Sequence, residues 1–181
     1  SDAFLSGAVN ASGGVDPGVQ SALKALSDFA QINLSGLALA AGAAPGLSTY
    51  TEAGITGVTA SNLNAINDAL ASAAVDGAAV DTAAELQAIV NAFNKVLATA
   101  NGTDGDATAV ATATDYESLG VTGVSAATAA LLGDVIDSKM TTDVDSVAEL
   151  QALADAAKVV LAYTSAAAAT ASGTVPTVAN L

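Results

Sequence analysis

The stretch Tyr50-Thr-Glu-Ala-Gly-Ile-Thr-Gly-Val-Thr-Ala60 occurs in a second, closely similar form later in the chain. It returns as Tyr116-Glu-Ser-Leu-Gly-Val-Thr-Gly-Val-Ser-Ala126, at an offset of 116 − 50 = 66 residues. A second block, Val80-Asp-Thr-Ala-Ala-Glu-Leu-Gln-Ala88, returns as Val144-Asp-Ser-Val-Ala-Glu-Leu-Gln-Ala152, at an offset of 144 − 80 = 64 residues. Two matching blocks in the same order indicate a tandem repeat with a period of about 65 residues.

The remainder of the chain fits the same period. Pro176-Thr-Val-Ala-Asn-Leu181, for example, resembles Pro45-Gly-Leu-Ser-Thr-Tyr50. We therefore divide the chain into 1–35 (the back part of a repeat), 36–46 (linker), 47–102 (first full repeat), 103–112 (linker), 113–166 (second full repeat) and 167–181 (linker and start of a further repeat).

Each repeat is expected to begin with a short helix. Thr114-x-x-Glu117 has the pattern of a capping box, and Gly120 is placed to close the helix that follows. The matching helix of the first repeat is expected over residues 49–53, closed by Gly54.

Two longer helices are expected after the Gly-Val-Thr-Gly-Val turn. Thr59 and Ser125 are the expected caps of the second helix, and Thr82-x-x-Glu85 and Ser146-x-x-Glu149 are capping boxes for the third. Apolar residues recur at helical spacing in each. For the second helix these are Leu63, Ile66 and Leu70, and Leu131 or Leu132, Val135 and Ile136. For the third they are Leu86, Ile89 or Val90, Phe93, Val96 and Leu97, and Leu150, Leu153, Ala157, Val160 and Leu161.

These patterns predict an all-α protein, built as tandem small three-helix bundles with one short and two longer helices in each repeat. Hydrophobic residues make up 52% of the chain but aromatic residues only 3%. Alanine forms helices well and buries little surface, so the core of each repeat is thin. A unit of about 65 residues has a marginal core, and we expect neighbouring units to support one another.

Composition excludes several functions. The net charge is −14, from 18 acidic residues against 4 basic ones, and the chain has no His or Cys. All four basic residues are lysines, and nucleic-acid binding needs clustered Lys and Arg. Without His or Cys there is no imidazole base, no thiol nucleophile and no Cys/His zinc site. We predict no catalytic, cofactor-binding or metal-binding residues and no cofactor.

Membrane insertion is not expected. The longest uncharged stretches, residues 29–51 and 159–181, are each interrupted by polar residues and proline. The first residues carry no basic segment of the kind that opens a signal peptide. The acidic chain is also expected to be repelled by anionic lipid.

One loop has the composition of a calcium site. Asn101-Gly-Thr-Asp104-Gly-Asp106 concentrates oxygen donors, but it lacks the closing Glu of a full calcium loop. We interpret it as a solvated turn and leave calcium binding by Asn101, Asp104 and Asp106 as the alternative.

Acidic and tyrosine residues recur at matched positions. Asp143 and Asp145 precede the third helix, and Asp81 matches Asp145 in the first copy. We expect them to cap the helix and to interact favourably with its dipole, rather than to form a catalytic carboxylate pair. Tyr50 and Tyr116 are expected to anchor the core rather than to contact a ligand.

Other patterns are weaker. Lys158 or Lys139 with a nearby Ser or Thr would imitate a Ser–Lys dyad, but no flanking pattern supports one. Asn10, Asn33 and Asn101 each begin a glycosylation sequon that is short enough to occur by chance.

The repeat signature resembles a known class of sequence. The period, the Tyr-x-x-(Ala/Leu)-Gly-(Ile/Val)-Thr-Gly-Val-(Thr/Ser) block and the Asp-(Thr/Ser)-x-Ala-Glu-Leu-Gln block are similar to the Ala-rich helical tandem repeats of giant secreted bacterial surface adhesins, exported by the type I route (RTX-type). The resemblance implies an extracellular protein of the bacterial cell surface, used for reach or attachment. Its partners would be neighbouring repeats, copies of itself, or a surface receptor or matrix ligand.

Three functions remain open. The favoured one is a structural or adhesive segment of an extracellular array. The alternative is a self-assembling filament subunit joined head-to-tail through incomplete terminal repeats, and an enzyme is the least favoured. The filament would cover the apolar faces that an incomplete first repeat leaves bare: Phe4, Leu5, Leu23, Leu26 and Phe29.

Overall fold

The chain is all-α over the residues that can be described. The computed structural model describes residues 19–20, 44–75, 80, 82–105 and 110–171. Within these ranges Asn101 and Met140 form an isolated antiparallel bridge, and no strand is present. The helices are α3 (Leu47–Glu52), α4 (Leu63–Ala71), α5 (Ala83–Thr99), α6 (Ala113–Ser118), α7 (Ala126–Asp137), the 3-10 helix η2 (Thr141–Asp143) and α8 (Val147–Ala171).

The capping boxes predicted for the third helix of each repeat are confirmed. Before α5, the Thr82 hydroxyl accepts a hydrogen bond from the Glu85 N–H, and a Glu85 carboxylate oxygen accepts from the Thr82 N–H. Ser146 and Glu149 make the same reciprocal pair before α8. These bonds satisfy donors that the first turn of a helix leaves without partners.

The start of α6 differs from the prediction. The capping box is Thr112 with Asp115, not Thr114 with Glu117. Asp115 also forms an ion pair with Lys95 on α5. Both the capping box and this ion pair therefore favour a helix that begins at Ala113. α3 likewise begins at Leu47, earlier than expected.

The second helices begin differently in the two repeats. Ser125 caps α7 as predicted, by accepting from the Thr128 N–H. Thr59 does not cap α4, because the Asn62 side-chain oxygen accepts from the Thr59 N–H and closes a turn before the helix begins at Leu63. The Asn62 amide also donates to the Asn94 side chain of α5, which holds the turn in place.

The same turn ends both short helices. After α3, the Gly54 N–H donates to the Thr51 carbonyl and the Ile55 N–H to the Tyr50 carbonyl; after α6, Gly120 and Val121 repeat this pattern. This is a Schellman turn, whose glycine adopts a positive φ, here 77° at Gly54 and 86° at Gly120. The glycines predicted to close the short helices are therefore confirmed in that role.

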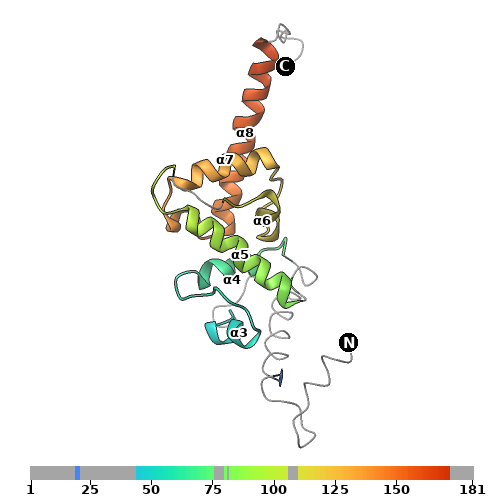
Figure 1. Cartoon of the computed structure of the whole chain (residues 1–181). Helices are drawn as coiled ribbons and strands as arrows, with labels where there is room; N and C mark the ends of the chain where they lie inside the picture. The colour runs from blue at the N-terminus through green and yellow to red at the C-terminus, as the bar shows by residue number, and fades with distance from the viewer. Residues whose placement is uncertain (1–18, 21–43, 76–79, 81, 106–109, 172–181) are drawn as a thin grey trace, which may run out of the picture.

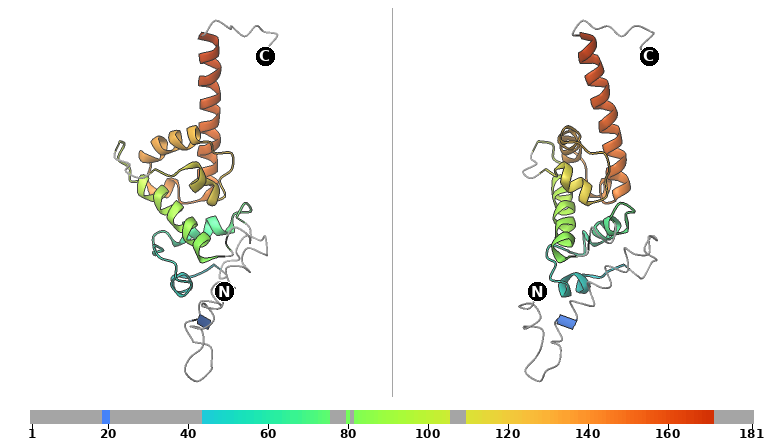
Figure 2. Two further views of the ribbon diagram at one scale, coloured as in Figure 1. Left: turned by 45° about the vertical axis from the view of Figure 1, so that its right-hand side comes forward. Right: turned by 90° about the vertical axis from the view of Figure 1, so that its right-hand side faces the viewer.

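The helices stack along one direction (Figures 1 and 2). α3 and α4 lie at one end, α5 runs from them towards α6 and α7, and α8 extends beyond α7 at the other end. α5 packs against α4 on one side and against α6 and α7 on the other. A single hydrophobic cluster includes buried residues from both sequence repeats.

The apolar stripes predicted for the helices are buried over most of their length. In α5 all the stripe residues are buried except Leu97, which is half-buried, and in α8 the stripe is buried or half-buried from Leu150 to Ala157. Val135 on α7 and Val160 on α8 were expected to be buried, but they are 36% and 51% exposed. For Val160 the reason is that the described helices pack on α8 only along its first half (Figure 1).

α8 is longer than predicted. It continues to Ala171, through part of the segment expected to be a linker from residue 167. Residues 166–169 are alanines, the strongest helix formers, and they carry the helix onward.

Candidate functional site: the junction between the two repeats

Hydrogen bonds recur at matching positions in both repeats. The Gln87 side-chain oxygen accepts from the Thr56 N–H at 2.9 Å, and its amide donates to the Thr56 carbonyl at 3.0 Å. Gln151 and Thr122 repeat both bonds, at 2.8 and 3.3 Å. In each repeat a glutamine of the long third helix thus fixes the turn that follows the short helix. The sequence carried the signal for this clamp, because both partners are identical in the two copies.

Tyr50 and Tyr116 are core residues, as predicted. Their exposed fractions are 0% and 1%, and the Tyr50 hydroxyl donates to the side-chain oxygen of Asn67 at 2.6 Å. Burial raises the pKa of both phenols above the ordinary value, and for Tyr116 the neighbouring Asp115 charge adds to the effect.

The surroundings of the two tyrosines differ between the repeats. Asn67 also donates to the Pro45 carbonyl at 3.1 Å. Its counterpart in the second repeat is Gly133, where an added Cβ would lie 2.3 Å from a methyl of Val110. Val110 therefore fills space in the second repeat that a larger side chain would need.

A charged pair links the two repeats. The Lys95 ammonium on α5 lies 2.8 Å from each oxygen of the Asp115 carboxylate on α6. Burial alone would raise the pKa of Asp115, but hydrogen bonds from Lys95 and Thr112 outweigh it and hold the pKa below its ordinary value. Neither residue was singled out from the sequence, because twenty positions separate them and only the fold brings them together.

Further contacts cross the junction between the two repeats. The Val147 N–H at the start of α8 donates to the Asp68 carboxylate of α4 at 2.7 Å. At Gly120, an added Cβ would lie 2.3 Å from the Ser72 hydroxyl oxygen, so the end of α4 lies against the turn after α6. The second repeat therefore contacts the first at two further points, one a hydrogen bond and the other a close approach of backbone and side chain.

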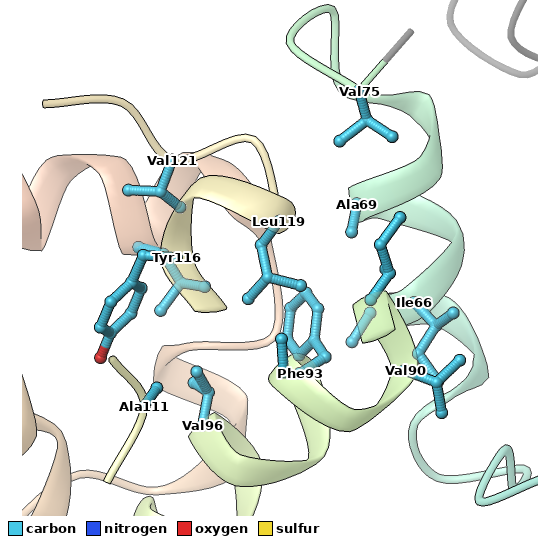
Figure 3. Close-up of a cluster of buried hydrophobic side chains, with 14 of the residues drawn as sticks. Ile66, Ala69, Val75, Val90, Phe93, Val96, Ala111, Tyr116, Leu119 and Val121 are labelled. Atoms are coloured by element: carbon cyan, nitrogen blue, oxygen red, sulfur yellow. The ribbon is translucent and has the colours of Figure 1, made fainter. Parts of the chain in front are cut away.

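The junction is also filled with apolar side chains (Figure 3). Phe93 and Val96 of α5 face Leu119 of the next repeat and Ala111 of the linker before it, and all four are nearly or fully buried. Ile66, Ala69 and Val75 continue the cluster on the side of the first repeat. The core of one repeat is therefore continuous with the core of the next.

The loop considered for calcium lies beside α7. Asn101 and Asp104 are exposed, Asp106 lies outside the described residues, and the Asn101 side-chain oxygen accepts from the Thr103 N–H at 2.7 Å. No group of three metal-ligating side chains occurs among the described residues.

Asp137, which sequence reasoning missed, contacts this loop. It is 4% exposed; one of its oxygens accepts from the Gly105 N–H, and the other has no hydrogen-bond partner among the described residues. Its counterpart in the first repeat is Ala71, so comparing the copies gave no signal of its role.

Asp143 and Asp145, the acids before α8, do not cap it. Asp143 accepts from the Met140 N–H and so caps η2 instead, and Asp81 lies outside the described residues. Asp145 is exposed and lines a hollow of about 300 Å³ between α5 and the η2 segment. The prediction that Asp143 caps the third helix was wrong, because Ser146 and the Asp68 carboxylate take the first N–H groups of α8.

The lysines considered for a Ser–Lys dyad have other surroundings. Lys158 pairs with Asp155 at 2.7 Å and donates to the Thr122 carbonyl at 3.5 Å, so its ammonium is held by a carboxylate. Lys139 is half-buried. Of the three sequon asparagines, Asn10 and Asn33 lie outside the described residues and Asn101 is exposed.

A second hollow, of about 430 Å³, lies over the turn after α6. It is lined by Ala74, Glu117, Val121, Thr122, Gly123 and Val124. Glu117 is its one ionisable group, so it brings together no acid–base pair.

Comparisons with known proteins identify no relative. No family model matches the chain, and comparisons with curated proteins and with solved structures found no match. Of the helices described, none combines the length and the apolar character needed to cross a membrane.

Proposed function

We propose that this chain is a structural segment of an extracellular repeat array, in which small three-helix units stack in tandem and act as a spacer or attachment module. The observation that carries the proposal is the continuous core at the junction, where Phe93 and Val96 of one repeat pack with Leu119 of the next. Stacked repeats gain stability from such nearest-neighbour interfaces and hold a fixed relative orientation. A spacer needs that rigidity.

The recurring hydrogen bonds support the tandem arrangement. The Gln–Thr clamp and the Schellman turn occur in both repeats at equivalent positions. Recurrent local geometry supports equivalent units, and the Lys95–Asp115 pair and the Asp68–Val147 bond support a defined angle between them.

A non-catalytic role is part of the proposal. The composition without His, Cys or Arg supports it, since it leaves only carboxylates, hydroxyls and lysines for chemistry. Among the described acids, Asp115 and Asp155 are each paired with a lysine and Asp68 with a helix N-terminus.

The location on a bacterial cell surface rests on the resemblance to adhesin repeats. The net charge of −14 suits a long array exposed to solvent, because like charges keep neighbouring chains apart. Attachment would then be made by a receptor-binding region or by the array surface itself.

The test is the length of arrays that carry additional repeats. We would measure the maximum dimension by small-angle X-ray scattering for the chain and for versions with one or two further copies of residues 47–112 inserted after Thr112, which keeps the register. A rigid stack lengthens by an equal increment per repeat, whereas flexibly linked beads lengthen with about the square root of repeat number.

The matched control carries a Gly/Ser linker in place of residues 103–110. The maximum dimension of this control should no longer increase by an equal amount per added repeat, although its helix content should be unchanged. Square-root scaling of the unaltered arrays would refute the spacer proposal, and growth of the 181-residue chain into polymers in light scattering would favour the filament instead.

A further inference from the structure

The second half of α8 presents apolar side chains to solvent. Val159, Val160 and Tyr163 are 70%, 51% and 75% exposed, and we call these three residues the α8 face. Residues three and four apart lie on the same side of a helix, so Val159, Val160 and Tyr163 form one continuous surface. This half of α8 projects beyond the other described helices (Figure 2).

The repeat identifies what covers the same positions elsewhere in the chain. With the offset of 64 residues, Val159, Val160 and Tyr163 correspond to Lys95, Val96 and Thr99 of α5. Val96 and Thr99 are 1% and 4% exposed, because α5 packs there against α6 and α7 of the following repeat. The α8 face is therefore the counterpart of the surface of α5 on which the short helix α6 and the following helix α7 pack.

One difference between the two surfaces concerns charge. On α5, Lys95 pairs with Asp115 of the next short helix, but the Lys95 position on α8 is occupied by Val159. An aspartate placed opposite Val159 would lose its ammonium partner and be desolvated beside a methyl surface. The occupant of the α8 face should carry an uncharged residue at the Asp115 position.

Two segments of the chain meet this requirement. We call the residues that lead into and form the short helix of a repeat its short-helix head. At the Asp115 position the short helix of the first full repeat has Thr49, which is uncharged. In the sequence Pro176-Thr-Val-Ala-Asn-Leu181, which matches Pro45–Tyr50, the corresponding residue is Asn180, also uncharged.

We propose that the α8 face is the seat for the short-helix head of a following repeat in the same chain, one with an uncharged residue at the Asp115 position. This inference rests on the proposed array function and adds to it the partner and its charge requirement. Val159 and Val160 pack on the incoming short helix, and Tyr163 extends the buried surface along α8.

The test uses protection of a thiol on the face. The chain has no cysteine, so Val160→Cys introduces a unique thiol, and Ala152→Cys on the exposed side of α8 provides the control. Each variant is prepared in the 181-residue chain and in a chain extended after Leu181 by a copy of residues 51–105. The rate of reaction with a small disulfide reagent is then measured.

In the extended chain the thiol of the Val160→Cys variant should react at least about tenfold more slowly than in the 181-residue chain, because it reacts only when the interface opens. The thiol of the Ala152→Cys control should react equally in both. Asn180→Asp in the extended chain should restore fast reaction, and adding Val159→Lys to it should slow the reaction again by re-creating the pair seen between Lys95 and Asp115.

Equal rates for Val160→Cys in the two chains would overturn the proposal. Protection that is insensitive to Asn180→Asp would overturn the charge requirement. A third outcome is that the thiol of the 181-residue chain becomes protected as the protein concentration is raised, while the particle mass increases. This would show that the α8 face binds another molecule, and it would also overturn the proposal. The scattering experiment on longer arrays separates these failures from failure of the spacer itself, since equal length increments do not depend on Val160.

Discussion

Phe93 offers the sharpest test of how the core is built. Its side chain is fully buried where α5 meets the second repeat, between residues of both repeats (Figure 3). Replacing it by alanine removes a whole ring at a site enclosed by helices on two sides, so the surroundings have little freedom to collapse. Buried Phe→Ala changes cost about 3 to 5 kcal/mol.

This loss should be visible in thermal and urea unfolding followed by circular dichroism. For a chain of this size, about 2 to 4 °C of melting temperature corresponds to each kcal/mol, so Phe93→Ala should lower the midpoint by roughly 6 to 20 °C. Phe93→Leu should lose less than half of that free energy, because it keeps most of the apolar volume.

Asp104→Ala is the matched control. Asp104 is exposed in the loop after α5, and a change there should stay within about 0.5 kcal/mol. Equal losses from Phe93→Ala and Asp104→Ala would refute the assignment of core and loop.

The remaining predictions concern the junction and the buried tyrosines. Lys95→Met should lower the free energy of unfolding by about 1 kcal/mol, a value that allows for the partial exposure of Lys95; urea unfolding at pH 7 measures it. Because the folded pKa of Asp115 lies below the ordinary 3.8, the pair stabilises the fold above that pH. The difference in stability between Lys95→Met and the parent should shrink below pH 3.8 and vanish as pH falls through the folded pKa of Asp115. Gly120→Ala should destabilise more than Gly54→Ala, since both strain a positive φ but only the Cβ at position 120 meets Ser72. The two buried phenols have raised pKa values, so they stabilise the fold below pH 10 and stability should fall as pH rises above that value; a flat profile from pH 9 to 12 would contradict this.

The sequence predicted the elements well where local chemistry decides them. The boxes at Thr82 and Ser146 and the glycines that close the short helices follow from hydrogen-bond requirements within a few residues. The stripe of α5 followed from helical periodicity. All of these signals lie within one helix and its ends.

The sequence failed where distant residues decide. α6 begins earlier than predicted because Asp115 pairs with Lys95 on α5. The carboxylate of Asp68 accepts a hydrogen bond from the first turn of α8, where Asp143 had been expected to cap the helix. The exposure of Val160 depends on which repeat lies beside α8, and periodicity alone carries no information about that neighbour. Asp137 was missed because its contact with Gly105 spans 32 positions.

If the two full repeats share one core, they should unfold as one cooperative unit. Since the chain has no cysteine, single thiols for fluorescent labels can be placed at exposed positions of each repeat, Ala88→Cys on α5 and Ala152→Cys on α8. Equilibrium urea unfolding is then followed at each label separately. Both labels should report the same midpoint, and Phe93→Ala should move both midpoints together. Two separate transitions in the unaltered chain, with Phe93→Ala shifting only the one reported from α5, would contradict it.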